Sequence, residues 1–534
     1  MTQRFLPGGL LFAIFMLMPV TAAASGDYLD YLFRSPTITD PGLANQFQQF
    51  IANVDNRQYL SADGQMDKLL AEPALAGVTP TTHAELLTDA GILKAVTNQD
   101  SQALNLLGQS VSLLEESVER YSPQQFNALM VSGMIKARAR DYPAAVEFYR
   151  RAQHVLHLQD GVYTRKQIPV LDQLTNLDQA RGTLLLSDVE QTFKLRIAER
   201  AYGANSEALI PTLESVAHYF AIRGKGLPRF IIDYDIQVPY LQGKVPSEIV
   251  DRTNAASSLD RRNSGPSIAD QDLWTRSTST YGDSQIRIYR GGLFDYAVEL
   301  YQRAITILEK KYGKNDVRLA QPLQSLSWTR LVEGNHKGAA KQALERATSI
   351  IVDSPVTDVE DHVLALVHLG DLYIITNDRR AGAKYHEAWL ILSQHPEMKK
   401  LGAQLFANPV RLYPEPFNYV LTRRPEKAGD DQALFAKLRF TVDKAGVPRD
   451  VHAVAGNISF SDQGNLATGF GSSTRYRPRL VGGYPVATPD VTYTQSFVVL
   501  ESQVSKSGPE KKAAKPDTKS AESNGGNSGS GTGA

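Results

Sequence analysis

The chain has 534 residues, 42% of them hydrophobic, which is enough for two or more globular domains. Lys plus Arg and Asp plus Glu both number 57. This balance excludes the strongly basic class of nucleic-acid-binding proteins and gives no general attraction to an anionic membrane. The absence of cysteine excludes disulfides, thiolate metal sites and a lipidated N-terminal cysteine.

The N-terminus predicts a secretory signal peptide over residues 1–24. Arg4 precedes an apolar run from Leu10 to Met18, and the small residues Ala22 to Ala24 provide an A-x-A cleavage site. The run is too short to cross a bilayer comfortably, and the alternative is a short buried helix. A chain that is exported without disulfides or lipid suits the bacterial periplasm, so we expect a periplasmic protein.

Helical spacing dominates residues 45–395, and the pattern repeats. Three positions recur at a spacing of 42 residues, with Gly91, Ala103 and Leu107 returning as Gly133, Ala145 and Tyr149. A period of this size predicts a solenoid of helix pairs. The second helix of each unit ends its apolar face with an alanine, at Ala152, Ala198, Ala304, Ala347 and Ala388. Small residues at such positions let a neighbouring helix approach closely.

The spacing small, aromatic, small in Ala145, Tyr149 and Ala152 resembles the signature of tetratricopeptide repeats. Residues 297–313 are similar to the longer repeats of kinesin-light-chain-like arrays. The resemblance implies a mostly α-helical solenoid, here over residues 45–226 and 284–395. It also implies peptide binding on the concave face, which the first helix of each unit lines.

Five residues are predicted to lie on that concave face and to contact a partner. They are Met130, Met134 and Arg138 in the repeat around Gly133, and His368 and Asp371 around Gly370. Asn127 is also expected on this face, in the same repeat as Met130. The two methionines suit an apolar groove, with an ordinary place in the core as the alternative.

An insertion interrupts the array at residues 227–283, where prolines and a polar stretch replace the helical pattern. Insertions of this kind map to one face of a solenoid. The insertion is either a partner-binding or lid element, or a tolerated surface loop. Asp233 and Asp235 in it are either a paired acid and base or part of a solvated edge.

A proline-rich linker at residues 396–432 ends the helical pattern, and the period then changes from 3.6 to 2. Alternation predicts strands over residues 436–442 and 491–499, with a turn at Asp443 to Gly446, a returning strand to Ala453, and a short helix near residues 462–470. We therefore expect a small α+β domain with a short antiparallel sheet over residues 433–502. Residues 503–534 predict a disordered tail, because they contain almost no large apolar side chains.

The order of these elements resembles the C-terminal domain of TonB-like energy transducers. The similar segments are Phe440 to Val447, Arg475 to Pro478 and Gly482 to Val486. The resemblance implies that an edge strand pairs with a peptide segment of a partner, such as an outer-membrane or other envelope protein. The last strand would supply this surface, so Val491, Tyr493 and Phe497 are its predicted partner-binding residues.

No sequence motif for a catalytic site, a metal site or a nucleotide cofactor is present. The ten histidines show no metal-binding spacing. We therefore expect a non-enzymatic scaffold without cofactors that binds protein or peptide partners and no nucleic acid. The alternatives are a component of TonB-dependent transport across the outer membrane, and an envelope enzyme with a site between the insertion and the concave face.

Overall fold

The structure is a computed structural model, and it describes residues 32–33, 36–226, 249, 280–334, 336–412, 419–421 and 433–499. The predicted signal peptide, nearly all of the predicted insertion and the predicted tail lie outside these residues. Within the described part of the chain, no helix is both long enough and apolar enough to span a membrane.

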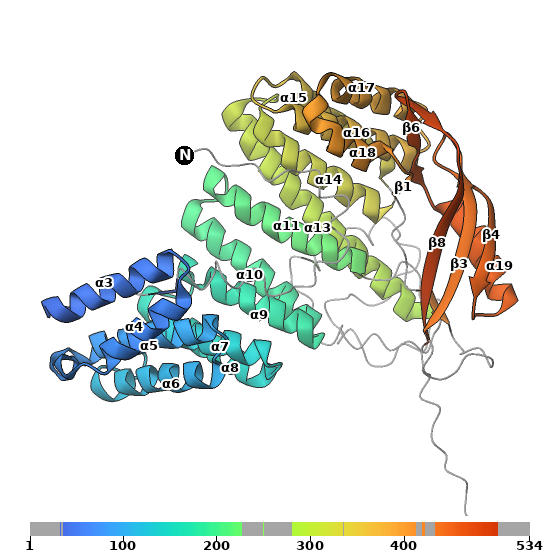
Figure 1. Ribbon diagram of the computed structural model, residues 1–534. Helices are drawn as coiled ribbons and strands as arrows, with labels where there is room; N and C mark the ends of the chain where they lie inside the picture. Colours follow the sequence, from blue (N-terminus) through green and yellow to red (C-terminus); the bar gives the residue numbers. More distant parts are fainter. Residues whose placement is uncertain are drawn as a thin grey trace, which may run out of the picture.

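Most of the described chain forms a helical-repeat solenoid, which confirms the predicted fold class (Figure 1). Consecutive helices pack as hairpins. The pairs are α3 (Pro41–Asp55) with α4 (Tyr59–Leu70), α5 (Pro80–Val96) with α6 (Asp100–Ser117), α7 (Gln125–Arg138) with α8 (Tyr142–Asp160), α9 (Ile168–Arg181) with α10 (Leu184–Tyr202), α11 (Ile210–Gly226) with α13 (Thr280–Tyr312), α14 (Ala320–Glu333) with α15 (Lys337–Asp353), and α16 (Val359–Ile375) with α17 (Ala381–Gln394). A further helix, α18 (Lys399–Phe406), lies within the segment predicted as a linker.

The repeated glycine allows the two helices of a hairpin to touch. A β-carbon placed on Gly133 would lie 2.5 Å from the ring of Tyr149, and one on Gly370 would lie 2.5 Å from the ring of Tyr385. Gly91 meets Leu107 in the same way, at 2.6 Å. The closing alanines found in the sequence are all fully buried. The repeat in the sequence therefore reflects a repeated close contact between a glycine backbone and a large side chain.

The turns of the array also repeat. Inside the hairpins, a residue with positive φ follows the first helix, as at Arg57, Asn98, Arg140, Gly182, Gly334 and Asn377. Between hairpins, Gly161, Gly203 and Gly313 have positive φ. The third residue after each of these glycines caps a short 3-10 turn with its side chain; these caps are Thr164, Ser206 and Asp316. The same local chemistry thus sets the direction of successive helices.

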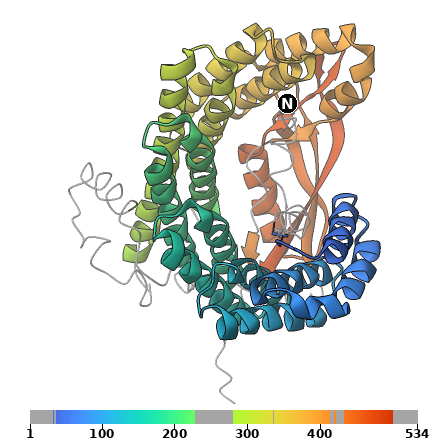
Figure 2. The same ribbon diagram turned by 90° about the vertical axis from the view of Figure 1, so that its left-hand side faces the viewer.

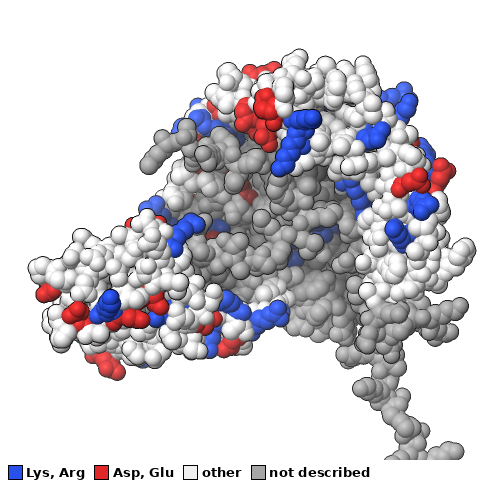
Figure 3. All heavy atoms as spheres, viewed as in Figure 1, with Lys and Arg blue, Asp and Glu red and all other residues white. Residues whose placement is uncertain are grey.

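Ion pairs join the second helices of successive hairpins. Each pair links one Arg and one Glu, and the series is Glu115 with Arg151, Glu190 with Arg150, Glu199 with Arg303, and Glu309 with Arg346. On the face shown in Figure 3, acidic and basic side chains of the described residues are interspersed, without one large patch of either sign. The balanced charge of the sequence is therefore spread along the array.

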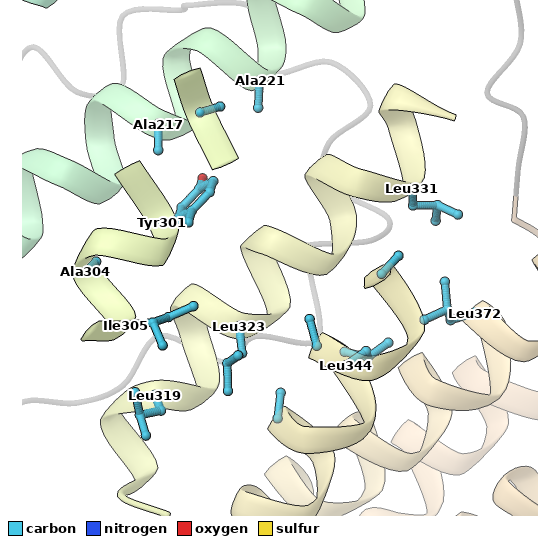
Figure 4. Packing of buried hydrophobic residues seen from close by; sticks show 14 of the residues in the cluster. Ala217, Ala221, Tyr301, Ala304, Ile305, Leu319, Leu323, Leu331, Leu344 and Leu372 are labelled. Carbon is cyan, nitrogen blue, oxygen red and sulfur yellow. The ribbon is translucent and has the colours of Figure 1, made fainter. Parts of the chain in front are cut away.

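The array curves into an arc (Figure 2), and its apolar core continues from hairpin to hairpin. Figure 4 shows one part of this core, where Ala217 and Ala221 of α11 lie close to Tyr301 of α13. Leu323 and Leu344 extend the same cluster into the next hairpin. Each hairpin buries apolar side chains against its neighbours, as expected for a solenoid.

A small α+β module follows the array. Its sheet has the order β2-β8-β3-β4, and the strands are β2 (Tyr419–Leu421), β3 (Leu434–Val442), β4 (Pro448–Gly456) and β8 (Thr488–Val499). Strands β3, β4 and β8 are antiparallel, and β2 runs parallel to β8. Helix α19 (Phe460–Ser473) covers one face with Leu466, Ala467 and Phe470. The strands and the helix predicted from the sequence are confirmed.

Candidate functional site

Strand β8 lies between β3 and the short outer strand β2. It pairs with β3 without a register shift from Val491, opposite Phe440, to Phe497, opposite Leu434. On its other side, β2 contacts only Phe497–Val499. Within the described part of the chain, the backbone from Thr488 to Ser496 therefore has no strand on that side. Such an edge is a template for a further strand.

The opposite edge, β4, is less suited to strand addition. Its pairing with β3 has two register shifts, and Asp450 in it adopts a positive φ of 54°. It also begins with Pro448, which has no amide hydrogen. Bulges and prolines of this kind protect edges from pairing. Strand β8 has similar irregularities only at its start, where Pro489 precedes Asp490 with a φ of 56°, so its regular part begins at Val491.

The side chains predicted as contacts on β8 serve the module itself. Tyr493 stacks on Phe470 with ring centroids 5.1 Å apart, and Phe497 is buried in the core of the sheet. Val491 packs against the same core. The guanidinium group of Arg411 lies 4.3 Å from the ring centroid of Tyr493. A partner strand would therefore pair with the backbone of β8, while these side chains anchor β8 in the module.

A buried ion pair fixes the module to the last hairpin of the array. Arg477 lies on β5 (Tyr476–Arg477) and donates from Nε and Nη2 to Oδ1 and Oδ2 of Asp371 on α16, at 2.8 and 2.5 Å. Tyr385 of α17 donates its hydroxyl to Oδ1 of the same carboxylate at 2.8 Å. Arg477 Nη1 also donates to the carbonyl of Leu405 at 3.3 Å. The Asp371 side chain is fully buried.

Burial shifts the pKa values of this cluster. It works against the charged guanidinium, but Asp371 outweighs it and raises the pKa of Arg477. Burial, and then Asp371, raise the pKa of Tyr385. Burial lowers the pKa of the neighbouring His368 to about 4, so this imidazole is neutral at neutral pH. The cluster is thus one cation and one anion, with neutral groups around them.

A second contact lies on α17. The hairpin of β6 (Arg479–Val481) and β7 (Tyr484–Val486) rests on His386 and Trp389, and the ring of Tyr484 stacks on His386 at 4.7 Å. A β-carbon on Gly483 would lie 2.6 Å from Trp389. The motif Gly482 to Val486 of the sequence is therefore a docking hairpin that faces the array.

The array residues predicted to contact a partner make contacts within the chain. Met130 is fully buried, and Met134 packs against the same core. Arg138 pairs with the carboxylate of Asp100 and donates to the carbonyl of Ala95 at 3.3 Å. His368 and Asp371 lie beneath the module, as described above. The structure thus brings His368 and Asp371 together with Arg477, and it places the three α7 residues in a separate part of the array.

Sequence reasoning assigned no role to Arg477 or Arg411. Arg477 lies in the segment Arg475 to Pro478, which was noted only for its resemblance to a family. The sequence signal at this position is an arginine between Tyr476 and Pro478, one of three arginines in residues 475–479. Among the described residues, no group of three His, Asp or Glu side chains is placed to hold a metal ion.

No protein-family model matches this chain, and no curated protein does. Among solved structures, it is similar to the crystal structure of BtubC (BKLC) from P. vanneervenii, with 14% identity over 62% of this chain and 97% of that chain, and a TM-score of 0.31. It is also similar to the structure of Naa15/Naa10 bound to HypK-THB, with 14% identity over 68% of this chain and 61% of that chain, and a TM-score of 0.20. With TM-scores this low, neither structure bears on the function of this chain.

Proposed function

We propose that this protein is a non-enzymatic interaction scaffold whose C-terminal module accepts a strand from a protein partner at β8. The observation that carries this proposal is the regular edge from Val491 to Ser496, which has no strand on one side among the described residues. An open edge gains a full set of backbone hydrogen bonds when an extended segment pairs with it. The helical array belongs, in this proposal, to the tetratricopeptide class, and the module to the TonB-like C-terminal class.

The joint between module and array supports a scaffold rather than two independent domains. The buried pair of Asp371 and Arg477 and the stacking of Tyr484 on His386 hold the sheet in one orientation. In Figure 1 the strands run in the order β8, β3, β4 away from the array, so the open edge is the one nearer the array. A strand bound at β8 would therefore be held at a defined place relative to the solenoid.

The proposed compartment is the periplasm, reached with a cleaved signal peptide over residues 1–24. N-terminal sequencing of the protein recovered from the cell envelope tests it. A mature chain beginning near Ser25 is the expected result. A chain that keeps Met1 and stays in the inner membrane would contradict export by cleavage and favour a role in TonB-dependent transport.

Proline substitutions test strand addition at β8. The amide hydrogens of Tyr493 and Thr494 point to opposite sides of the strand. One of the variants Tyr493→Pro and Thr494→Pro therefore removes a bond to β3 and opens the module, while the other removes a donor from the free edge only. The expected result is one folded variant that has lost the partner. Thr494→Ala is the matched control, because it keeps the amide hydrogen.

The partner is found by placing a photo-crosslinking residue at Thr492 or Ser496, whose side chains are exposed beside the edge. Mass spectrometry should identify a short extended segment of one envelope protein, and the edge-directed proline should abolish that crosslink. If the crosslink persists in a folded edge-directed variant, β8 is not the binding surface.

A further inference from the structure

A short non-helical segment precedes α3 and lies across the first hairpins. We call the described residues 32–33 and 36–39 the strap. Leu32 is only 1% exposed and belongs to the core built by α5, α6, α7 and α8. The side-chain amide of Asn127 on α7 donates to the carbonyl of Leu32 at 2.5 Å. The strap is thus held by both its side chain and its backbone.

Two further contacts extend along the strap. Phe33 packs against two core clusters and meets the ring of Phe50 edge to face, with centroids 6.0 Å apart. Thr82 Oγ1 on α5 donates to the carbonyl of Thr37 at 3.3 Å. Among the described residues, the strap makes no backbone-to-backbone hydrogen bond with the array. Among these residues, its two hydrogen bonds to the array come from helix side chains, those of Asn127 and Thr82.

The strap lies where the sequence predicts a binding face. Asn127 and Thr82 belong to the first helices of their hairpins, and Asn127 was placed on the concave face from its position in the repeat. In Figure 2 the blue chain before α3 runs on the inner side of the arc. A surface that buries Leu32 and donates side-chain hydrogen bonds to the carbonyls of Leu32 and Thr37 has the chemistry for binding an extended peptide.

We propose that the surface of α3, α5 and α7 that contacts the strap is a peptide-binding site whose resting occupant is the chain's own strap. Its ligands are extended segments that carry two adjacent large apolar side chains, as Leu32 and Phe33 do. The strap is joined covalently to α3, so its high effective concentration keeps other segments out until a partner displaces it. This inference rests on the proposed scaffold function and adds a second site to it.

The test adds the strap back as a separate molecule. The probe is a fluorescein-labelled peptide of residues 28–40, and its anisotropy is measured with three forms of the full chain. The wild-type chain should not bind it. The variant Leu32→Asp/Phe33→Asp, whose own strap is released, should bind it saturably. Adding Asn127→Leu should weaken that binding by about tenfold, because one buried hydrogen bond is lost.

Controls make the result decisive. A peptide with the same two Asp substitutions should not bind, and the edge-directed proline in β8 should leave binding unchanged, which separates this site from the proposed strand addition. If the strap-released variant keeps its helical circular dichroism but binds no peptide, the proposal is overturned.

Thiol labelling covers the case in which that variant does not fold. The chain has no cysteine, so Leu32→Cys places a single thiol at the buried position of the strap, and Leu156→Cys places one in the core of the array as the control. The thiol at position 32 should react through an opening at least a hundredfold more frequent than the global unfolding that exposes position 156. If both thiols react only with global unfolding, the strap is a fixed part of the core, and the proposal is again overturned.

Discussion

Arg477 and Asp371 are 106 residues apart in the chain, and they form a buried two-point ion pair between the C-terminal module and helix α16. The pair is completed by the hydroxyl of Tyr385 and by the carbonyl of Leu405. Every charged atom of this pair thus has a partner, and the cost of burying two charges is offset by geometry. The pair therefore fixes the C-terminal module to helix α16 of the array.

Breaking this pair on one side should separate the module from the array. Arg477→Met leaves the Asp371 carboxylate buried without its cation, and we expect a loss of about 3–5 kcal/mol in the free energy that couples the two parts. Urea unfolding followed by circular dichroism, and by the fluorescence of Trp389 at the joint, should then show two transitions. The double variant Asp371→Leu/Arg477→Met should recover most of the coupling. A double variant as unstable as the single one would contradict this account.

Adding one methyl group inside a hairpin should destabilise the array. In Gly133→Ala the new β-carbon would lie 2.5 Å from the ring of Tyr149, so we expect a loss of about 1–3 kcal/mol in the free energy of unfolding. Gly108→Ala is the matched control, because it lies in helix α6 with no atom within 4 Å of the added group. That control should gain about 0.5–1 kcal/mol from helix propensity. Equal effects in both variants would refute the close contact.

Acid should weaken the protein through His368. Its pKa is about 4 in the folded chain against 6.5 for an unburied histidine, since burial disfavours the charged ring. The unfolded chain therefore binds a proton that the folded chain does not, and stability falls as the pH drops from about 6.5 to 4, by up to ~3 kcal/mol. His368→Gln should flatten the pH dependence in this window. Unfolding curves from pH 7 to 4 measure it, with the exposed His452→Gln as control for loss of an imidazole. An unchanged slope in His368→Gln would exclude this residue as the cause.

Reversing one charge in the series of Arg–Glu pairs should be corrected by reversing its partner. Arg303→Glu places two acidic groups together at Glu199 and removes the donor to the carbonyl of Ala204, so we expect a loss of about 1 kcal/mol. Glu199→Arg in the same chain should restore part of it, and 1 M salt should reduce both effects. Thermal unfolding of the two single variants and the double variant gives the coupling. Additive changes would mean that the pair does not contribute.

Much of the array can be predicted from residue spacing, because its contacts join residues that are close in the sequence. Gly133 and Tyr149 are close in sequence, and the hairpins that contain Gly91 and Gly370 repeat the same contact of a glycine with a large side chain. The strands of the module are readable for a similar reason, since alternation from Ala436 to Val442 needs only one buried face. The turn at Gly446 was also predicted, and its φ is 74°. Local periodicity therefore determined which elements form.

The chain order of elements did not determine which faces remain open. His368 and Asp371 have the spacing of a concave surface, but Arg477 arrives from 106 residues away and covers them. Asn127 was expected to face a partner, and it binds Leu32 of the same chain. Both outcomes depend on contacts between distant segments, for which a single sequence carries no periodic signal. The sequence by itself determined the repeat, the strands and their buried faces. The tertiary structure decided which of these surfaces are covered by other parts of the same chain. The reason is that a charge or an apolar surface becomes buried only when segments distant in the sequence come into contact.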